Sequence, residues 1–128
     1  MKKYVLFIGI DISKKWFDAS VTTDGLKESI KHKQFANTLK GFKKLLFWLG
    51  EQEQSLGVQG HYLFCLEHTG VYTLPICVFL QEHSLDYILE SALRIKRSLG
   101  IRRGKNDKAD SKDIAMYAFL HSKKLITS

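Results

Sequence analysis

Two apolar runs in this 128-residue chain end in a carboxylic acid, which limits the folds that can bury them. Residues 4–10 precede Asp11, and residues 62–66 precede Glu67. Short apolar runs bounded by polar residues are typical of buried strands. An open α/β sheet presents its ligand site at the carboxyl ends of its strands. The pattern therefore predicts two buried strands that deliver acids to one edge of a sheet.

A second pair of acids, Asp107 and Asp110, precedes a helical pattern predicted over residues 108–120. The spacing of three places both acids on one helix face if the helix begins at or just before them. Asp113 continues this spacing, and periodicity alone does not exclude it. Each acid also has an ordinary alternative, because Asp caps turns and helix N-termini and is favoured in a first helical turn.

Convergence of Asp11, Glu67, Asp107 and Asp110 would require cations, because clustered carboxylates repel one another. Mg²⁺ fits best, since it prefers oxygen ligands and shares its shell with water and substrate phosphate. Two ions about 4 Å apart would stabilise the attacking and leaving oxygens of a phosphoryl transfer. We therefore expect a site for two Mg²⁺ ions, with Mn²⁺ as a substitute.

The positive charge of the chain is concentrated next to the second acid pair. Twenty Lys and Arg against thirteen Asp and Glu give a net charge of +7. Between residues 91 and 108, Asp107 alone opposes seven bases, which are Arg94, Lys96, Arg97, Arg102, Arg103, Lys105 and Lys108. Cations beside an acid cluster suit a polyanion whose phosphate is drawn to bound metal, although a basic run can also be a solvated face. A second basic region, with Lys31, Lys33, Lys40, Lys43 and Lys44, is interpreted as solvated surface.

Length and composition predict one folded domain over residues 1–128, with 45% hydrophobic and 12% aromatic residues. No apolar stretch reaches the ~18 residues of a membrane span, and the N-terminus does not resemble a signal peptide. We therefore expect a cytoplasmic protein. Cys65 and Cys77 lack the spacing of a zinc site and are expected to be reduced core residues.

The predicted element order is βββαβαβαα. Strands are expected over residues 4–10, 16–22, 27–35, 62–66 and 87–89. Helices are expected from residue 39 to about 50–54 after an Asn37 or Thr38 cap, from Tyr72 or Leu74 to Glu82, and over 93–99 and 108–120. This order, with acids ending the first and fourth strands, is the arrangement of ribonuclease-H-like (RuvC-like) α/β domains, a mixed sheet with flanking helices.

Three segments, GIDISK at 9–14, EHTGVY at 67–72 and KNDKADSKDIA at 105–115, resemble the motifs of IS110-family transposases. The resemblance covers the whole chain. It implies a RuvC-like N-terminal domain in which Asp11, Glu67, Asp107 and Asp110 form a DEDD set, and it leaves Asp113 at a variable position. The chain departs from the family pattern at Asn106, where Thr is usual.

The resemblance also implies a function. The parent protein would be a prokaryotic site-specific DNA recombinase of an insertion sequence, acting on donor and target DNA and directed by a structured RNA. A serine in a C-terminal domain would attack the DNA while Mg²⁺ ions lie near the scissile phosphate. The chain would then be a fragment, inactive alone, of a protein that forms homo-oligomers and has no membrane partner.

Two other functions fit the same residues. A resolvase-like nuclease would use the acids and metal to activate water, without a serine from another domain. A non-catalytic nucleic-acid-binding module would use residues 94–108 to hold RNA or DNA, while the acids only cap and pair. Cleavage by this chain alone would favour the nuclease, and binding independent of metal and of the acids would favour the module.

Overall fold

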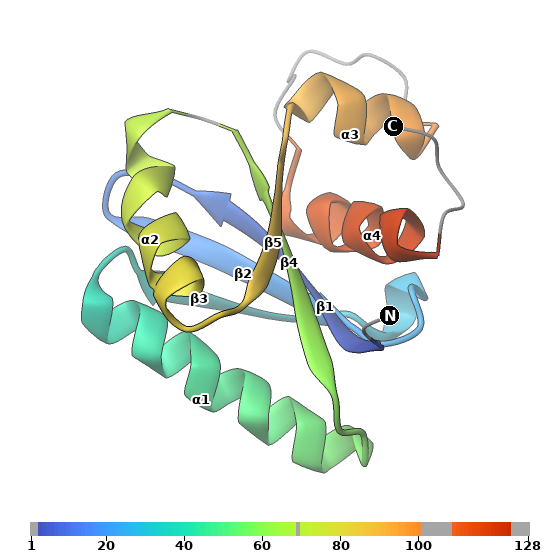
Figure 1. The fold of residues 1–128 in the computed structure, drawn as a ribbon. Coiled ribbons are helices and arrows are strands. Elements are labelled where there is room, and N and C mark those ends of the chain that lie inside the picture. Colours follow the sequence, from blue (N-terminus) through green and yellow to red (C-terminus); the bar gives the residue numbers. More distant parts are fainter. Residues whose placement is uncertain (1–2, 69, 101–108, 124–128) are drawn as a thin grey trace.

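A mixed sheet of five strands forms the centre of the computed structural model, which describes residues 3–68, 70–100 and 109–123 (Figure 1). Its strands are β1 (Tyr4–Ile12), β2 (Trp16–Thr22), β3 (Lys31–Ala36), β4 (His61–Glu67) and β5 (Asp86–Glu90). They lie in the order β3-β2-β1-β4-β5. β1, β4 and β5 are parallel to one another, and β2 is antiparallel to both β1 and β3. The mixed sheet and the predicted order of elements are confirmed.

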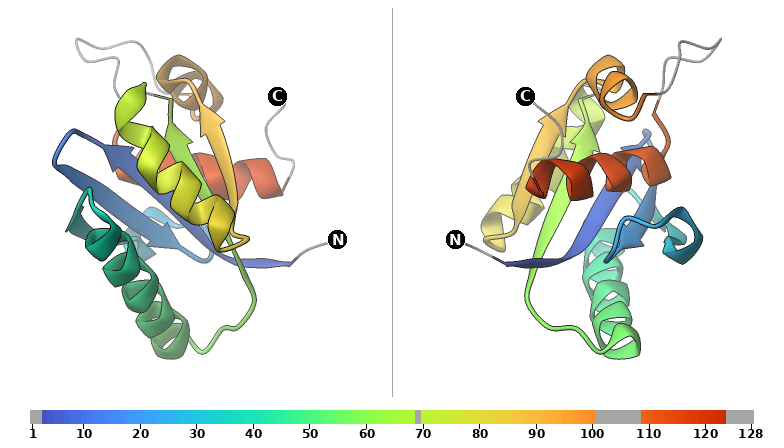
Figure 2. Two further views of the ribbon diagram at one scale, coloured as in Figure 1. Left: turned by 60° about the vertical axis from the view of Figure 1, so that its left-hand side comes forward. Right: turned by 90° about the vertical axis from the view of Figure 1, so that its right-hand side faces the viewer.

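Helices cover both faces of this sheet (Figure 2). α1 (Leu39–Leu56) and α2 (Leu74–Glu82) lie on one face, and α4 (Ser111–Ser122) crosses the other, with α3 (Ala92–Ser98) beside it. None of the helices in the described segments is long and apolar enough to cross a membrane.

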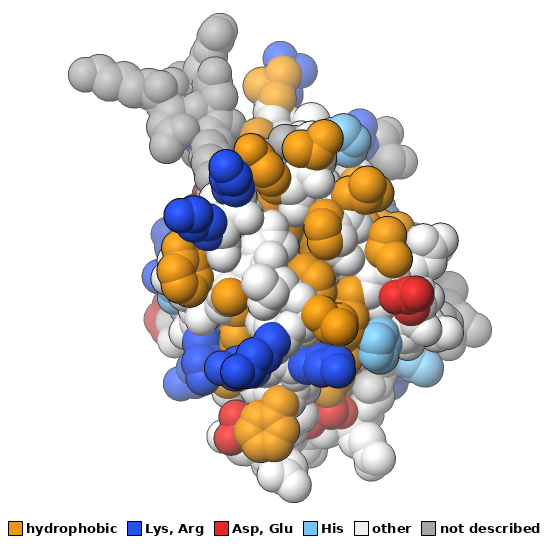
Figure 3. Space-filling model, turned by 90° about the vertical axis from the view of Figure 1, so that its left-hand side faces the viewer, with side chains coloured by type: hydrophobic (Ala, Val, Ile, Leu, Met, Phe, Trp, Pro, Cys, Tyr) orange, Lys and Arg blue, Asp and Glu red, His pale blue; other side chains and the backbone are white. Residues whose placement is uncertain are grey.

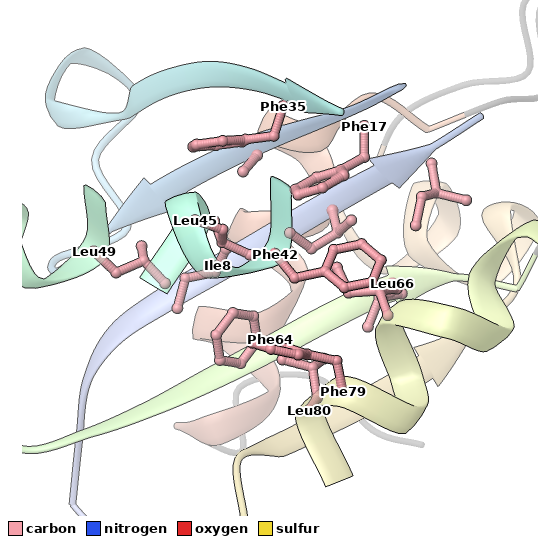
Figure 4. Close-up of a cluster of buried hydrophobic side chains, with 14 of the residues drawn as sticks. Ile8, Phe17, Phe35, Phe42, Leu45, Leu49, Phe64, Leu66, Phe79 and Leu80 are labelled. Carbon is pink, nitrogen blue, oxygen red and sulfur yellow. The ribbon is translucent and has the colours of Figure 1, made fainter. Parts of the chain in front are cut away.

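Strand alternation separates two hydrophobic cores. On β1, Ile8 and Ile10 belong to the core under α1 and α2, where aromatic residues from β2, α1, β4 and α2 pack together (Figure 4). Phe7 points the other way, into a smaller core with Ile114 and Tyr117 of α4. Because successive side chains face opposite sides of a sheet, Gly9 and Asp11 lie on the same face as Phe7, beneath α4.

Gly9 lets α4 lie directly on β1. A Cβ at this position would lie 2.2 Å from both the Ala115 nitrogen and the Ser111 carbonyl oxygen, closer than non-bonded atoms approach. Beside this contact, the buried hydroxyls of Ser20 on β2 and Ser111 on α4 form a 2.7 Å hydrogen bond. These two contacts place the N-terminus of α4 over β1 and β2.

Three predicted boundaries were wrong for local reasons. β1 continues through Ile12, which pairs with Phe17, so Asp11 lies within the strand and does not follow it. Residues 27–29 form a 3₁₀ turn and not the start of β3, because Asp24 accepts hydrogen bonds from the Leu26 amide and the Ser29 hydroxyl. α1 runs beyond residue 54 to Leu56, where Gly57 ends it with φ of 66°.

The predicted start of the last helix was also wrong, because α4 begins at Ser111. Asp110 is its N-cap and therefore does not lie on a helix face. Asp107 falls outside the described residues.

Candidate metal and nucleic-acid site

Asp11 and Glu67 occupy equivalent positions on neighbouring parallel strands. The residues just before them, Ile10 and Leu66, are register partners of β1 and β4. Ile10 and Leu66 belong to the core on the opposite face of the sheet. Because successive strand residues face opposite sides, Asp11 and Glu67 face α4. Glu67 is buried, with 5% of its surface exposed, and Asp11 is half-buried. The sheet therefore brings together the two acids that lie 56 residues apart in the sequence.

Asp110 approaches Asp11 from the helical layer. The two residues line one pocket of about 310 Å³ with Asp18, His32, Ser111 and Lys112. The Oδ1 atom of Asp110 accepts a 2.8 Å hydrogen bond from the Asp113 amide, so the capping alternative holds for this residue. A cap of this kind needs only one carboxylate oxygen. The position thus combines a structural role with access to the pocket of Asp11.

Two further acids lie in register with Asp11 and Glu67, and the four together form a line across the sheet that we call the acid row. Asp18 on β2 is the register partner of Asp11, and Glu90 on β5 is the register partner of Glu67. Sequence analysis considered neither Asp18 nor Glu90 for the site. The alignment of these four acids depends on pairing between strands that are distant in the sequence. No local sequence pattern predicts it.

The two outer acids, Asp18 and Glu90, each have basic and polar partners. Asp18 lies 3.4 Å from the His32 imidazole and accepts a 3.3 Å hydrogen bond from the Gln34 amide. Glu90 lies 3.4 Å from Arg94 and accepts a hydrogen bond from the Tyr117 hydroxyl at 3.2 Å. These contacts mark Asp18 and Glu90 as flanking residues of the row.

The predicted basic residues fall in two groups. Arg94 is partly engaged within the domain, because its Nε also donates to the Tyr117 hydroxyl at 3.3 Å, while Lys96 and Arg97 lie in the last turn of α3. Arg102, Arg103, Lys105 and Lys108 lie, with Asp107, outside the described residues.

The described residues do not form a complete set of metal ligands. Within residues 3–68, 70–100 and 109–123, no three His, Cys, Asp or Glu side chains are grouped closely enough to hold one ion. The oxygen donors of Asp11, Glu67 and Asp110 nevertheless match the preference of Mg²⁺, which completes its shell with water and substrate. The donor chemistry fits a hard divalent cation that is bound jointly with substrate.

Asp113, in the first turn of α4, gives the site region a pH-dependent stability. Burial, and next the nearby negative charge of Asp110, raise the pKa of Asp113 above its ordinary value. The folded state therefore binds this proton more tightly than the unfolded state, and the protein loses stability as pH rises through the folded pKa. Asp113→Asn is expected to raise the free energy of unfolding at pH 7 by less than about 1 kcal/mol, because the position is partly exposed.

Urea unfolding of both proteins from pH 3 to pH 8 measures this effect. The gain should disappear near pH 3, where Asp113 is protonated in both states. Asp24→Asn is a control for which we expect the opposite effect, a lower free energy of unfolding at pH 7, because hydrogen bonds from Ser29 and Leu26 lower the pKa of Asp24. A gain at Asp113→Asn that did not vary with pH would exclude titration as its cause.

Comparison with family models identifies the family of this chain. The family model DEDD_Tnp_IS110, described as transposase, matches residues 8–128. The chain belongs to this transposase family. No protein with a curated function is significantly similar in sequence.

Solved structures connect the IS110-type domain to a known fold. The structure of T. thermophilus RuvC in complex with Holliday junction substrate superposes with a TM-score of 0.56 at 10% identity, covering 94% of this chain and 96% of that chain. The ethanolamine utilization protein EutJ from Carboxydothermus hydrogenoformans gives a TM-score of 0.47 at 14% identity over 77% of this chain and 42% of its own, too low to establish a shared fold. The transposase domain therefore has a RuvC-like, ribonuclease-H-type fold, and family and fold together indicate a DNA-acting enzyme.

Proposed function

We propose that this domain is the metal-binding catalytic domain of an insertion-sequence recombinase that cleaves and rejoins DNA strands. The observation that carries the proposal is the placement of Asp11 and Glu67 on adjacent parallel strands, with Asp110 in the pocket of Asp11. Membership of a transposase family supports DNA as the substrate. The Holliday junction bound to the similarly folded RuvC supports it further.

Asp11, Glu67 and Asp110 would hold the metal, together with Asp107 from outside the described residues. Bound Mg²⁺ would supply Lewis-acid stabilisation of charge on the phosphate oxygens. The sheet fixes Asp11 and Glu67, and the close packing of α4 on Gly9 fixes Asp110. Lys112 and His32 line the same pocket and would attract the phosphate group.

The remaining parts of the recombinase would come from outside this chain. We propose a serine nucleophile on a C-terminal domain, a guide RNA from the same element, donor and target DNA, and a homo-oligomeric assembly. In this arrangement residues 1–128 are one domain that does not cleave alone. The basic residues 94–108 would contact the nucleic-acid backbone.

A resolvase-like nuclease is the second candidate, because the likeness to RuvC covers nearly the whole of both chains. In that case the acids and bound metal would activate water, and the domain would need no serine. Mg²⁺-dependent cleavage of branched DNA by residues 1–128 alone would favour this function.

Thermal unfolding with and without millimolar Mn²⁺ tests the metal site. We expect Mn²⁺ to stabilise the wild-type domain by about 1.4 kcal/mol at ten times its Kd, since it binds only the folded state. Asp11→Asn, Glu67→Gln and Asp110→Asn should each lose this gain. Without metal the same variants should melt at least as high as wild type, because each removes a charge from a repelling group.

Glu28→Gln is the matched control, because Glu28 is an exposed acid in the turn before β3. It should keep the full Mn²⁺ effect. If Mn²⁺ changes no melting temperature and nucleic-acid affinity is equal in all variants, the chain is a non-catalytic binding module.

A further inference from the structure

A groove of about 670 Å³ runs between the edge strand β3 and α1, on the opposite face of the sheet from the acid row. Three lysines, Lys33, Lys40 and Lys44, line it together with the aromatic residues Trp16 and Phe47. Figure 3 shows the side of the molecule on which α1 and α2 lie, where a band of Lys and Arg side chains runs between exposed hydrophobic ones. We define these five residues as the β3–α1 groove.

The spacing of the residues on α1 explains how the groove forms. Lys40 and Lys44 are four residues apart and Phe47 follows three residues later, so the three share one side of the helix. Gly41 keeps this side close to β3, because a Cβ there would lie 1.8 Å from the Ala36 carbonyl oxygen. Two lysines and then an aromatic ring therefore follow one another along one fixed edge of the helix.

The lysines of the groove remain available to a ligand. Within the described part of the chain, none of the three forms an ion pair, and Glu51 is the single acid in the groove lining. Lys33 has its Nζ 5.8 Å from the centroid of the Phe35 ring, which orients the ammonium group without neutralising it. The groove therefore carries a net positive charge.

The aromatic residues of the groove expose large apolar surfaces. Trp16 is 52% exposed and Phe47 is 72% exposed, although most aromatic residues of α1 and β2 are buried. Exposed rings between lysines are the arrangement that single-stranded nucleic acids bind, with bases stacked on rings and phosphates on cations. A protein partner fits less well, because it would have to bury three lysines that form no ion pair with the acids of the described segments.

We propose that the β3–α1 groove binds single-stranded nucleic acid, DNA or RNA. His32 lines the acid pocket and the next residue, Lys33, lines the groove, because successive strand residues face opposite sides of the sheet. A strand leaving the acid pocket would therefore pass around the edge of β3 into the groove. The proposal goes beyond strand cleavage, since binding here needs no metal.

Fluorescence anisotropy with labelled oligonucleotides of about 15 nucleotides tests the groove, with separate dT and rU probes in EDTA. Trp16→Ala and Phe47→Ala are each expected to weaken binding about 10-fold. Replacing Lys33, Lys40 and Lys44 together by alanine should reduce the slope of log affinity against log salt by about 2, since each phosphate contact to a single strand contributes about 0.7. The probe that binds with the higher affinity identifies DNA or RNA as the ligand.

Matched controls come from the same helix. Lys43→Ala removes an exposed α1 lysine, and Leu39→Ala removes an exposed α1 apolar side chain, and neither residue lines the groove. Both should bind as wild type does. Tryptophan fluorescence should be quenched by the oligonucleotide, and Trp16→Phe should reduce that quenching while keeping most of the affinity, since Trp48 also lines the groove.

Unchanged affinity in the groove variants would overturn the proposal, as would equal losses in Lys43→Ala and Leu39→Ala. Groove variants that change self-association but not oligonucleotide affinity would instead identify a protein interface. Because the assay contains EDTA, a failed metal site leaves its result unaffected, and the two proposals fail separately.

Discussion

Asp11→Asn is expected to slow the proposed DNA strand cleavage by at least about 1000-fold. Asparagine keeps the shape of the side chain and removes its charge, so the loss would report on metal binding and not on packing. The position supports this expectation, because Asp11 lies beside Glu67 on the neighbouring strand and shares a pocket with Asp110. The measurement is the single-turnover rate of cleavage of end-labelled donor DNA by the protein that carries the proposed serine-bearing domain.

Asp18→Asn is the most informative control for this prediction. Asp18 lies opposite Asp11 in register and lines the same pocket, but it interacts with His32 and Gln34. We expect this variant to retain most of the wild-type rate. An equal loss in Asp18→Asn would show that the general negative charge of the pocket matters, and that the specific set of Asp11, Glu67 and Asp110 does not.

The strands that carry the acids could be predicted from the sequence because their signals are local. An apolar run followed by Asp11 or Glu67 is visible in a window of eight residues, and a helix cap at Asn37 or Thr38 was equally predictable, of which the structure has Thr38. The alignment of Asp18 and Glu90 with those acids was not readable, because strand register depends on pairing between distant segments. The same limit applies to the contact between Gly9 and α4.

The residues of the β3–α1 groove show a second limit of sequence reasoning. The sequence predicts a helix from residue 39, but Leu39 is exposed in α1 whereas Trp48 is buried. The lysines between these positions were interpreted as solvated surface because charge alone does not reveal a groove. Only the packing of α1 against β3 places Lys40 and Lys44 opposite Lys33.

Gly9→Ala is expected to destabilise the domain by about 3 kcal/mol, measured by urea unfolding. The new Cβ would lie 2.2 Å from backbone atoms of Ser111 and Ala115 and 2.8 Å from the carbonyl carbon of Ile114. Backbone atoms within a helix cannot rotate away as a side chain can, so α4 would have to move off β1. Fully buried Ile114 and Tyr117 would then lose packing with the sheet.

The same substitution tests whether α4 positions Asp110 over the acid row. A helix displaced from β1 would carry Asp110 away from Asp11. Gly9→Ala should therefore also lose stabilisation by Mn²⁺, although the four proposed metal ligands are unchanged. Gly50→Ala is the matched control, because a Cβ at Gly50 meets nothing within 4 Å, and alanine inside a helix is favoured over glycine by about 1 kcal/mol. If Gly9→Ala were as stable as wild type and kept the Mn²⁺ effect, close packing of α4 on β1 would not be what assembles the site.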